Sequence, residues 1–213
     1  MPKLQLSFAC GLYDRMQPLY TGEVKPAGID LNFIVAGAQV VGDSVLEGQV
    51  EIALTFNPPD VLGFRVERTM VYQLGAVVKS DHPLAGRSEV AFADCVEYGL
   101  VLPDETLSYR QVIDSVWAKT IGGRTRGTIQ ANSIGLLKAL VQSGPGVGLL
   151  TRLDVTGEMA DGRLAFVPLA EPNIPLSVLS LITASGRTLS VPASLLLNHL
   201  AQVMRESGVG GAG

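Results

Sequence analysis

Apolar and polar residues alternate at the start of the chain, where Leu4, Leu6 and Phe8 mark one face of a strand. Later apolar positions instead recur at helical spacing, and glycine and proline separate the segments. The pattern predicts these elements in the first quarter of the chain: a strand ending at 9–11, a short helix from Asp14, a strand over 29–35, a helix over 37–48 and a strand over 50–56.

The rest of the chain continues the alternation of strand and helix. Residues 64–78 are mostly extended, and we expect one strand there that leaves a first lobe and enters a second. Residues 177–183 are apolar and would bring the chain back, and a helix over 190–206 closes the fold. Between the two crossings the pattern predicts strands over 98–102, 126–130, 147–150 and 164–169, and helices over 109–119, from Asn132 or Ser133 to Ser143, and over 152–160.

Strands that alternate with helices favour an α/β fold with helices layered on a parallel sheet. We place the first lobe at residues 1–74 plus 178–207, the second lobe at 75–177 and a flexible tail at 208–213. Two lobes joined by two crossing segments imply a cleft. Ligands of open parallel sheets bind beyond the carboxyl ends of the strands, where the amides of helix starts favour anions.

Composition narrows the function classes. The chain has 213 residues, of which 47% are hydrophobic and 17% charged, and its net charge is −4. Scattered basic residues and an acidic balance argue against direct binding of nucleic acid, which needs clustered Lys and Arg. The N-terminus does not read as a signal peptide, and no apolar run approaches about 20 residues. We therefore expect a cytoplasmic protein with no membrane contact and two free thiols, Cys10 and Cys95.

From about Ile29 to Glu206 the chain resembles the effector-binding domain of LysR-type transcriptional regulators. The matching segments are GQVEIALTF at 48–56, DHPLA at 81–85, LVQSGPGVGLL at 140–150 and GRL at 162–164. The resemblance implies a type 2 periplasmic-binding-protein-like fold. It also implies a cytoplasmic sensor of small metabolites, often carboxylates or aromatic acids, that controls transcription and assembles as a dimer. The winged helix-turn-helix of such regulators has no counterpart here, so we expect no DNA binding by this chain itself.

The first 33 or so residues are similar to the start of 4,5-dihydroxyphthalate decarboxylases. The segments that carry this similarity are ACGLYDR at 9–15 and GEVKPAGIDL at 22–31. In a decarboxylase, Arg15 would bind a carboxylate and Asp14 would handle a proton. A helix cap and a solvated charge are the simpler roles for this pair, and we favour them.

The candidate ligand-binding residues lie in turns at strand ends, where helix-start amides and hydroxyl or amide side chains can hold a carboxylate. Ordinary capping and turn chemistry is the alternative for the whole set. Asp104 lies in one of these turns. The predicted contacts are Cys10, Gly11, Ala38, Gln39, Asn57, Pro103, Thr106, Asn132 and Ser133.

We interpret the other potentially reactive side chains as structural or surface residues and not as catalytic or metal-binding ones. Cys10 could act as a nucleophile at a helix start, but a small buried residue is the interpretation we prefer. We expect His82 at the surface, and Arg110 and Lys138 as solvated charges on their helices. Two histidines without an acidic cluster do not support a metal site, and no phosphate-loop motif is present, so we expect no cofactor.

Three functions remain open. The preferred one is an effector-binding module, for a small anionic organic molecule, that catalyses no reaction. The alternatives are a decarboxylase of hydroxylated aromatic acids and a solute-binding protein. The first is preferred because its resemblance spans most of the chain, and no acid and cation pair for loss of CO₂ is evident.

Overall fold

The computed structural model describes residues 3–11, 19, 21–23, 25–58, 62–105, 110–120, 128–144 and 146–208. The chain divides into two compact units. Unit 1 is Met1–Val71 with Val178–Gly213, and unit 2 is Tyr72–Ser177. The chain passes from one unit to the other within β4 (Phe64–Tyr72) and returns within β10 (Ser177–Ala184).

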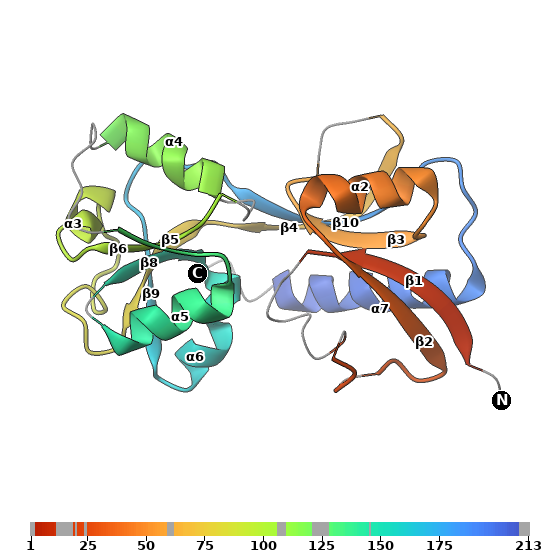
Figure 1. The fold of residues 1–213 in the computed structure, drawn as a ribbon, viewed down its shortest axis with the longest axis horizontal. Helices are drawn as coiled ribbons and strands as arrows, with labels where there is room; N and C mark the ends of the chain where they lie inside the picture. The colour runs from red at the N-terminus through yellow and green to blue at the C-terminus, as the bar shows by residue number, and fades with distance from the viewer. Residues whose placement is uncertain are drawn as a thin grey trace. The chain divides into compact units, whose positions relative to one another are not determined.

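Unit 1 is built on a five-stranded mixed sheet with the order β2-β1-β3-β10-β4. β1 (Leu4–Cys10) runs parallel to β2 (Ile29–Val35) and to β3 (Ile52–Phe56), whereas β10 is antiparallel to β3. Helices α2 (Ala38–Glu47) and α7 (Val191–Gly208) lie on opposite faces of this sheet (Figure 1). β3 is buried along its whole length, as expected for a central strand covered on both faces.

Unit 2 repeats the plan with the strand order β7-β6-β8-β5-β9. β6 (Leu100–Pro103) is parallel to β7 (Thr128–Ala131) and β8 (Val147–Thr151). β5 (Leu74–Lys79) is antiparallel to β8 and to β9 (Leu164–Pro168).

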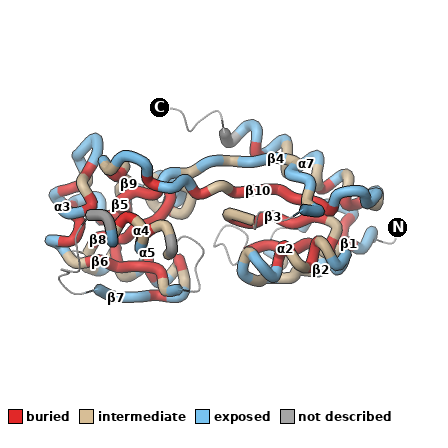
Figure 2. The backbone as a smooth tube through the Cα atoms, turned by 90° about the horizontal axis from the view of Figure 1, so that it is seen from above, coloured by how far each residue is buried: buried red, intermediate tan, exposed pale blue. Residues whose placement is uncertain are grey.

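Helices cover both faces of the second sheet (Figure 1). α3 (Phe92–Val96) and α4 (Arg110–Thr120) lie on one side, where the rings of Phe92 and Trp117 meet edge to face at 5.7 Å. α5 (Ile134–Ser143), the 3-10 turn η2 (Arg152–Val155) and α6 (Thr156–Ala160) complete the unit. Figure 2 shows the buried backbone running along the central strands of each sheet.

The predicted α/β fold class is confirmed, with several differences in detail. Both sheets are mixed instead of parallel, because β10 and β5 enter their sheets in the opposite direction. The single strand expected over 64–78 is two strands that meet at Gln73. The short helix α3 was not expected, and α7 extends through Gly208, where we predicted the tail to begin.

The helix expected from Asp14 and the tail beyond Gly208 lie outside the described residues. Among the described residues, no helix is both long and apolar enough to span a membrane.

Candidate functional site

The predicted site residues of unit 1 gather at one edge of its sheet. Cys10 pairs with Val35 across β1 and β2, so these parallel strands end together, and β3 ends at the same edge. The Ala36 amide donates to the Cys10 carbonyl at 3.2 Å, which ties the turn after β2 to the end of β1. Cys10, Gly11 and the start of α2 therefore share one edge of the sheet.

The start of α2 suits an anion better than an ordinary helix start does. Its N-cap is Gly37, so no side chain caps the first turn, and that turn contains no acidic residue. Ala38 is half-buried and Gln39 is exposed, with the Gln39 amide donating to Asp43 at 3.0 Å. Uncapped amides and the helix dipole favour negative charge at this position.

Cys10 is a buried packing residue, not a reactive thiol. Its side chain has no exposed surface, and burial raises the pKa of the thiol to about 11. A thiol with that pKa remains protonated at neutral pH and is a poor nucleophile. Gly11 is buried beside it. Asp14 and Arg15, the residues that carry the decarboxylase interpretation, lie outside the described residues.

Asn57 has a clear structural role at the end of β3. Its backbone φ is 46°, in the left-handed region that few non-glycine residues adopt. Its side-chain oxygen accepts a hydrogen bond from the Val178 amide at 2.9 Å, and its own amide donates to the Val178 carbonyl at 2.8 Å. Asn57 thus fastens the start of β10 to the end of β3.

Unit 2 presents a second set of strand ends. Pro103 pairs with Ala131 across β6 and β7, and the Asp104 amide donates to the Ala131 carbonyl at 3.0 Å. Ser133 is the N-cap of α5, and its hydroxyl accepts from the Leu136 amide at 3.4 Å, whereas Asn132 is exposed. The structure therefore brings Pro103, Asn132 and Ser133 together. Thr106 lies outside the described residues.

Arg110 is largely buried, whereas a solvated charge was expected from the sequence. Its side chain is only 14% exposed. Its Nη1 donates to the carbonyl of Pro103 at 2.9 Å, and its Nε donates to Asp114 at 2.8 Å. A cation is thereby held at the carboxyl end of β6. The position of Arg110 shortly after a strand-end turn is the one sequence signal for this role, and the sequence analysis did not use it.

Lys138 is also largely buried, although a solvated charge was expected. Its side chain is 12% exposed and pairs at 2.9 Å with Glu158, which is 14% exposed. The same ammonium donates to the Asp154 carbonyl at 3.2 Å, and the Asp154 carboxylate accepts from Thr151 in a capping box at the end of β8. Burial is the largest single influence and acts to raise the pKa of Glu158. The hydrogen bond from Lys138, a backbone hydrogen bond and the charges of Lys138 and Arg163 together outweigh it, so the pKa is lowered.

His82 is also buried, contrary to expectation, with 8% of its surface exposed. Its Nδ1 accepts from the Leu84 amide at 3.2 Å, and its ring packs on that of Tyr98 at 4.5 Å. The imidazole therefore closes the turn by accepting from its backbone and packs against an aromatic ring. No group of three or more His, Cys, Asp or Glu side chains in the described ranges is arranged to hold a metal ion.

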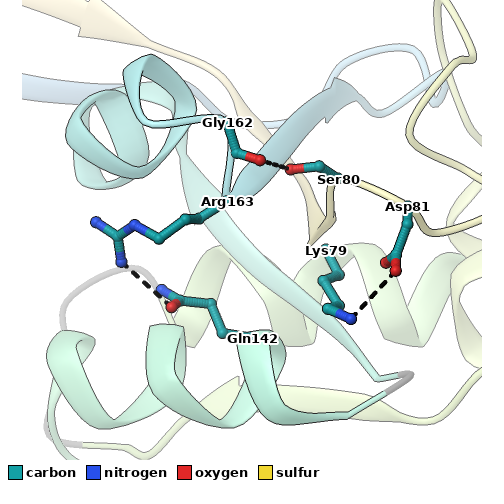
Figure 3. A pocket seen from close by; sticks show the side chains of 6 residues that line it. All are labelled: Lys79, Ser80, Asp81, Gln142, Gly162 and Arg163. Carbon is teal, nitrogen blue, oxygen red and sulfur yellow. Dashed lines mark hydrogen bonds and ion pairs between the residues drawn. The ribbon is translucent and has the colours of Figure 1, made fainter.

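Two hollows lie away from these strand ends. One, of about 350 Å³, is in unit 2 and is lined by Lys79, Ser80, Asp81, Gln142, Gly162 and Arg163 (Figure 3). It sits at the amino end of β8, since β5 runs antiparallel to that strand. Its cations are already paired, Lys79 with Asp81 at 3.1 Å and Arg163 with Asp161 at 2.8 Å.

The second hollow, of about 640 Å³, is in unit 1, at the amino-terminal halves of β1 and β2. Across it Gln5 donates to Asp30 at 3.0 Å, and Asn32 donates to Ser7 at 3.4 Å. None of its described lining residues is a lysine or an arginine. Neither hollow offers an unpaired cation among the described residues, whereas the uncapped amides at the start of α2 favour an anionic ligand.

Comparison with known proteins gives one family match. The model of the LysR substrate binding domain matches residues 26–205, which is most of the chain. A search of curated protein sequences finds no significant match.

Several solved structures share the fold. The regulatory domain of Synechocystis PCC6803 CcmR, in complex with 2-PG, has a TM-score of 0.73 at 18% identity, over 95% of this chain and 98% of that one. The effector-binding domain of QuiR, in complex with shikimate, has a TM-score of 0.69 at 14% identity, over 96% and 98%. HinK, a LysR family transcriptional regulator from Pseudomonas aeruginosa, has a TM-score of 0.69 at 19% identity, over 96% of this chain and 71% of that one.

Proposed function

The chain belongs to the LysR substrate binding domain family, and on that premise we propose that it binds a small anionic organic effector and performs no chemistry on it. Effector binding by the regulatory domains of CcmR and QuiR supports the sensor role. The observation that carries the anionic class is the uncapped start of α2 at the carboxyl end of the unit 1 strands. The strand-end residues of each unit are the proposed contacts.

A screen of organic acids tests this proposal. A panel of carboxylic and phosphorylated acids is added to the protein, and thermal unfolding is followed at constant ionic strength. A ligand that binds only the folded chain at 100 times its Kd stabilises it by about 2.7 kcal/mol. At least one acid should raise the melting temperature in a saturable manner while remaining chemically intact. No stabilisation by any acid, or release of CO₂ from hydroxyphthalates, would contradict the proposal.

The role of the α2 start is tested by Ala38→Asp. An acid in the first turn stabilises a helix by about 0.3–1 kcal/mol, so the fold is not harmed. The new carboxylate should nevertheless repel an anionic effector and weaken its binding at least several-fold. Asn198→Asp is the matched control, since it adds the same charge at an exposed position of α7. Equal affinities for the two variants would remove the α2 start from the site.

We further propose that the chain is cytoplasmic and assembles as a homodimer. Both proposals rest on membership of the family. Size-exclusion chromatography with light scattering, at micromolar concentration, should give twice the mass of the chain. A strictly monomeric mass at the highest soluble concentration would contradict the dimer.

A further inference from the structure

Two segments of unit 2 begin at the carboxyl edge of its sheet. β6 is parallel to β7 and to β8, so all three strands end at this edge. α5 begins directly after β7, and η2 begins directly after β8. Since β6 lies between these strands, the two starts are about 10 Å apart. Ser133, the N-cap of α5, is one of the proposed ligand contacts, so the separation of the two starts helps to shape this edge.

The side chain of Lys138 joins the two segments. Lys138 lies in the second turn of α5, and its ammonium donates to the carbonyl of Asp154 in η2 at 3.2 Å. The same ammonium pairs at 2.9 Å with Glu158 of α6, and both side chains are less than 15% exposed. Figure 1 shows α5 and α6 next to each other on the sheet. One largely buried cation thus holds α5 against the segment that follows β8.

Both ends of this tie are fixed locally. The carboxylate of Asp154 accepts from the Thr151 amide at 2.9 Å and from the Thr151 hydroxyl at 2.7 Å, which closes a capping box on the last residue of β8. At the other end, the Ser133 hydroxyl accepts from the Leu136 amide at 3.4 Å. A continuous series of bonds and backbone therefore runs from the end of β8, through Lys138, to the first turn of α5.

The choice of an ion pair at this position needs a reason other than stability. Apolar side chains of similar volume in place of a buried pair are often as stabilising or more so. Hydrogen bonds differ from apolar contacts in being directional, since they weaken steeply when donor and acceptor move out of line. A lysine bonded to both η2 and α6 therefore fixes where α5 lies along the sheet, which an apolar contact does less well.

We propose that Lys138 is a positioning residue, which holds the start of α5 and η2 at a fixed separation and so preorganises the carboxyl edge of unit 2 for its effector. Lys138 acts through these two segments and does not itself contact the effector. The effect on effector binding rests on the proposed function, whereas the ordering of the edge does not.

Hydrogen exchange of the chain without added acid tests the ordering of the edge. In Lys138→Met, amides of residues 134–137 and 151–155 should exchange about tenfold faster, because these segments open locally at lower cost. Leu84→Ala is the matched control: Leu84 is fully buried in the turn after β5, and its truncation lowers stability without touching the tie. It should leave the exchange of both segments unchanged. Trp117 fluorescence identifies any variant that fails to fold.

Two more variants separate positioning from stability. Lys138→Met with Glu158→Met restores an apolar contact but not the bond to Asp154, so stability should recover while the edge still exchanges fast. Glu158→Gln lowers stability but keeps that bond, so the edge should exchange slowly. The double variant also carries the test if Lys138→Met alone does not fold.

Binding is measured by calorimetry with the acids of the panel, which include benzoate, succinate and inorganic phosphate, at constant ionic strength. Loss of preorganisation predicts about 3- to 10-fold weaker binding in both variants that lack Lys138. Leu84→Ala and Glu158→Gln, once folded, should bind as the unchanged chain does.

The outcomes distinguish this inference from the proposed function. Unchanged exchange at the edge in folded Lys138→Met, or exchange and affinity that recover together with stability in the double variant, overturns the positioning role and leaves the effector function standing. Fast exchange at the edge with no response of the unchanged chain to any acid overturns the proposed function and keeps the ordering of the edge by Lys138. Unchanged exchange and no acid binding would overturn both.

Discussion

Replacing Lys138 with methionine tests how far one buried ion pair holds unit 2 together. Methionine keeps the length and apolar stem of lysine but leaves the Glu158 carboxylate without its cation. It also removes the donor to the Asp154 carbonyl in η2, the turn after β8. The pair joins α5 to α6, so the substitution should loosen the helices on one face of the sheet.

The magnitude follows from the burial of both partners. Removing one partner of a buried pair costs about 3–5 kcal/mol, chiefly because the other charge remains desolvated. Lys138 and Glu158 keep 12% and 14% exposure, so we expect the lower end, about 3 kcal/mol. The double variant Lys138→Met with Glu158→Met should recover most of this loss, since apolar replacement of both partners is often close to neutral.

Urea unfolding followed by the fluorescence of Trp117, the single tryptophan, measures the effect in unit 2 itself. With a slope of about 2 kcal/mol/M, the midpoint of Lys138→Met should fall by about 1.5 M. Lys79→Met is the control, because its pair with Asp81 is exposed and should be worth less than about 1 kcal/mol. Equal midpoints for the two single variants, or no recovery in the double variant, would refute the reasoning.

The pH dependence of the same pair has a definite sign. The pKa of Glu158 is lowered in the folded chain, so its contribution is fully present above the unfolded carboxyl pKa of about 4.3 and is lost as pH falls through the folded pKa. The stability difference between the unchanged chain and Glu158→Gln should therefore be constant from pH 7 to about pH 5.5 and shrink below it. A difference that grows on acidification would contradict this assignment.

Three further outcomes are expected. Cys10 and Cys95, whose pKa values burial raises to about 11 and about 12, should not react with a thiol reagent at pH 8 until the chain is unfolded; rapid labelling of the native chain would contradict their burial. Asn57→Ala should lower the free energy of unfolding, measured by circular dichroism in urea, by about 2 kcal/mol, because the Val178 amide loses its acceptor and alanine is strained at a positive φ. Asn57→Gly should lower it less, since glycine adopts this φ without strain. Equal losses for the two variants would exclude the backbone contribution. Gly148→Ala should cost about 1–3 kcal/mol, because its Cβ would lie 2.9 Å from a methyl carbon of α5; an unchanged midpoint would show that α5 can shift freely.

Much of the fold was predictable from local patterns. The strand over 29–35 and the helix ending at Gly48 were predicted because side-chain periodicity and a glycine with positive φ are local signals. The direction of β10 and β5 was not predicted, because the sequence of an apolar strand buried on both faces has the same pattern whichever way the strand runs in its sheet. The break at Gln73 was missed because the strands on both sides of it are extended, and no glycine or proline marks the break itself.

The turns at the strand ends were predictable, but the surroundings of the charged side chains near them were not. Turns after Cys10, Pro103 and Ala131 were found because parallel strands end at one edge. The surroundings of Arg110 and Lys138 were not predicted, because a solvated cation and a largely buried cation can occupy the same position in a helical sequence pattern. Their partners on the next turn or on another helix become neighbours only in the folded chain.

Native mass spectrometry of the chain, incubated with the best acid from the panel, shows whether an effector is bound and whether it stays intact. We expect a complex whose added mass equals that of the intact acid, stable over hours and weakened in Ala38→Asp. A complex that lacks the mass of CO₂, or a chain that retains no acid at all, would contradict it.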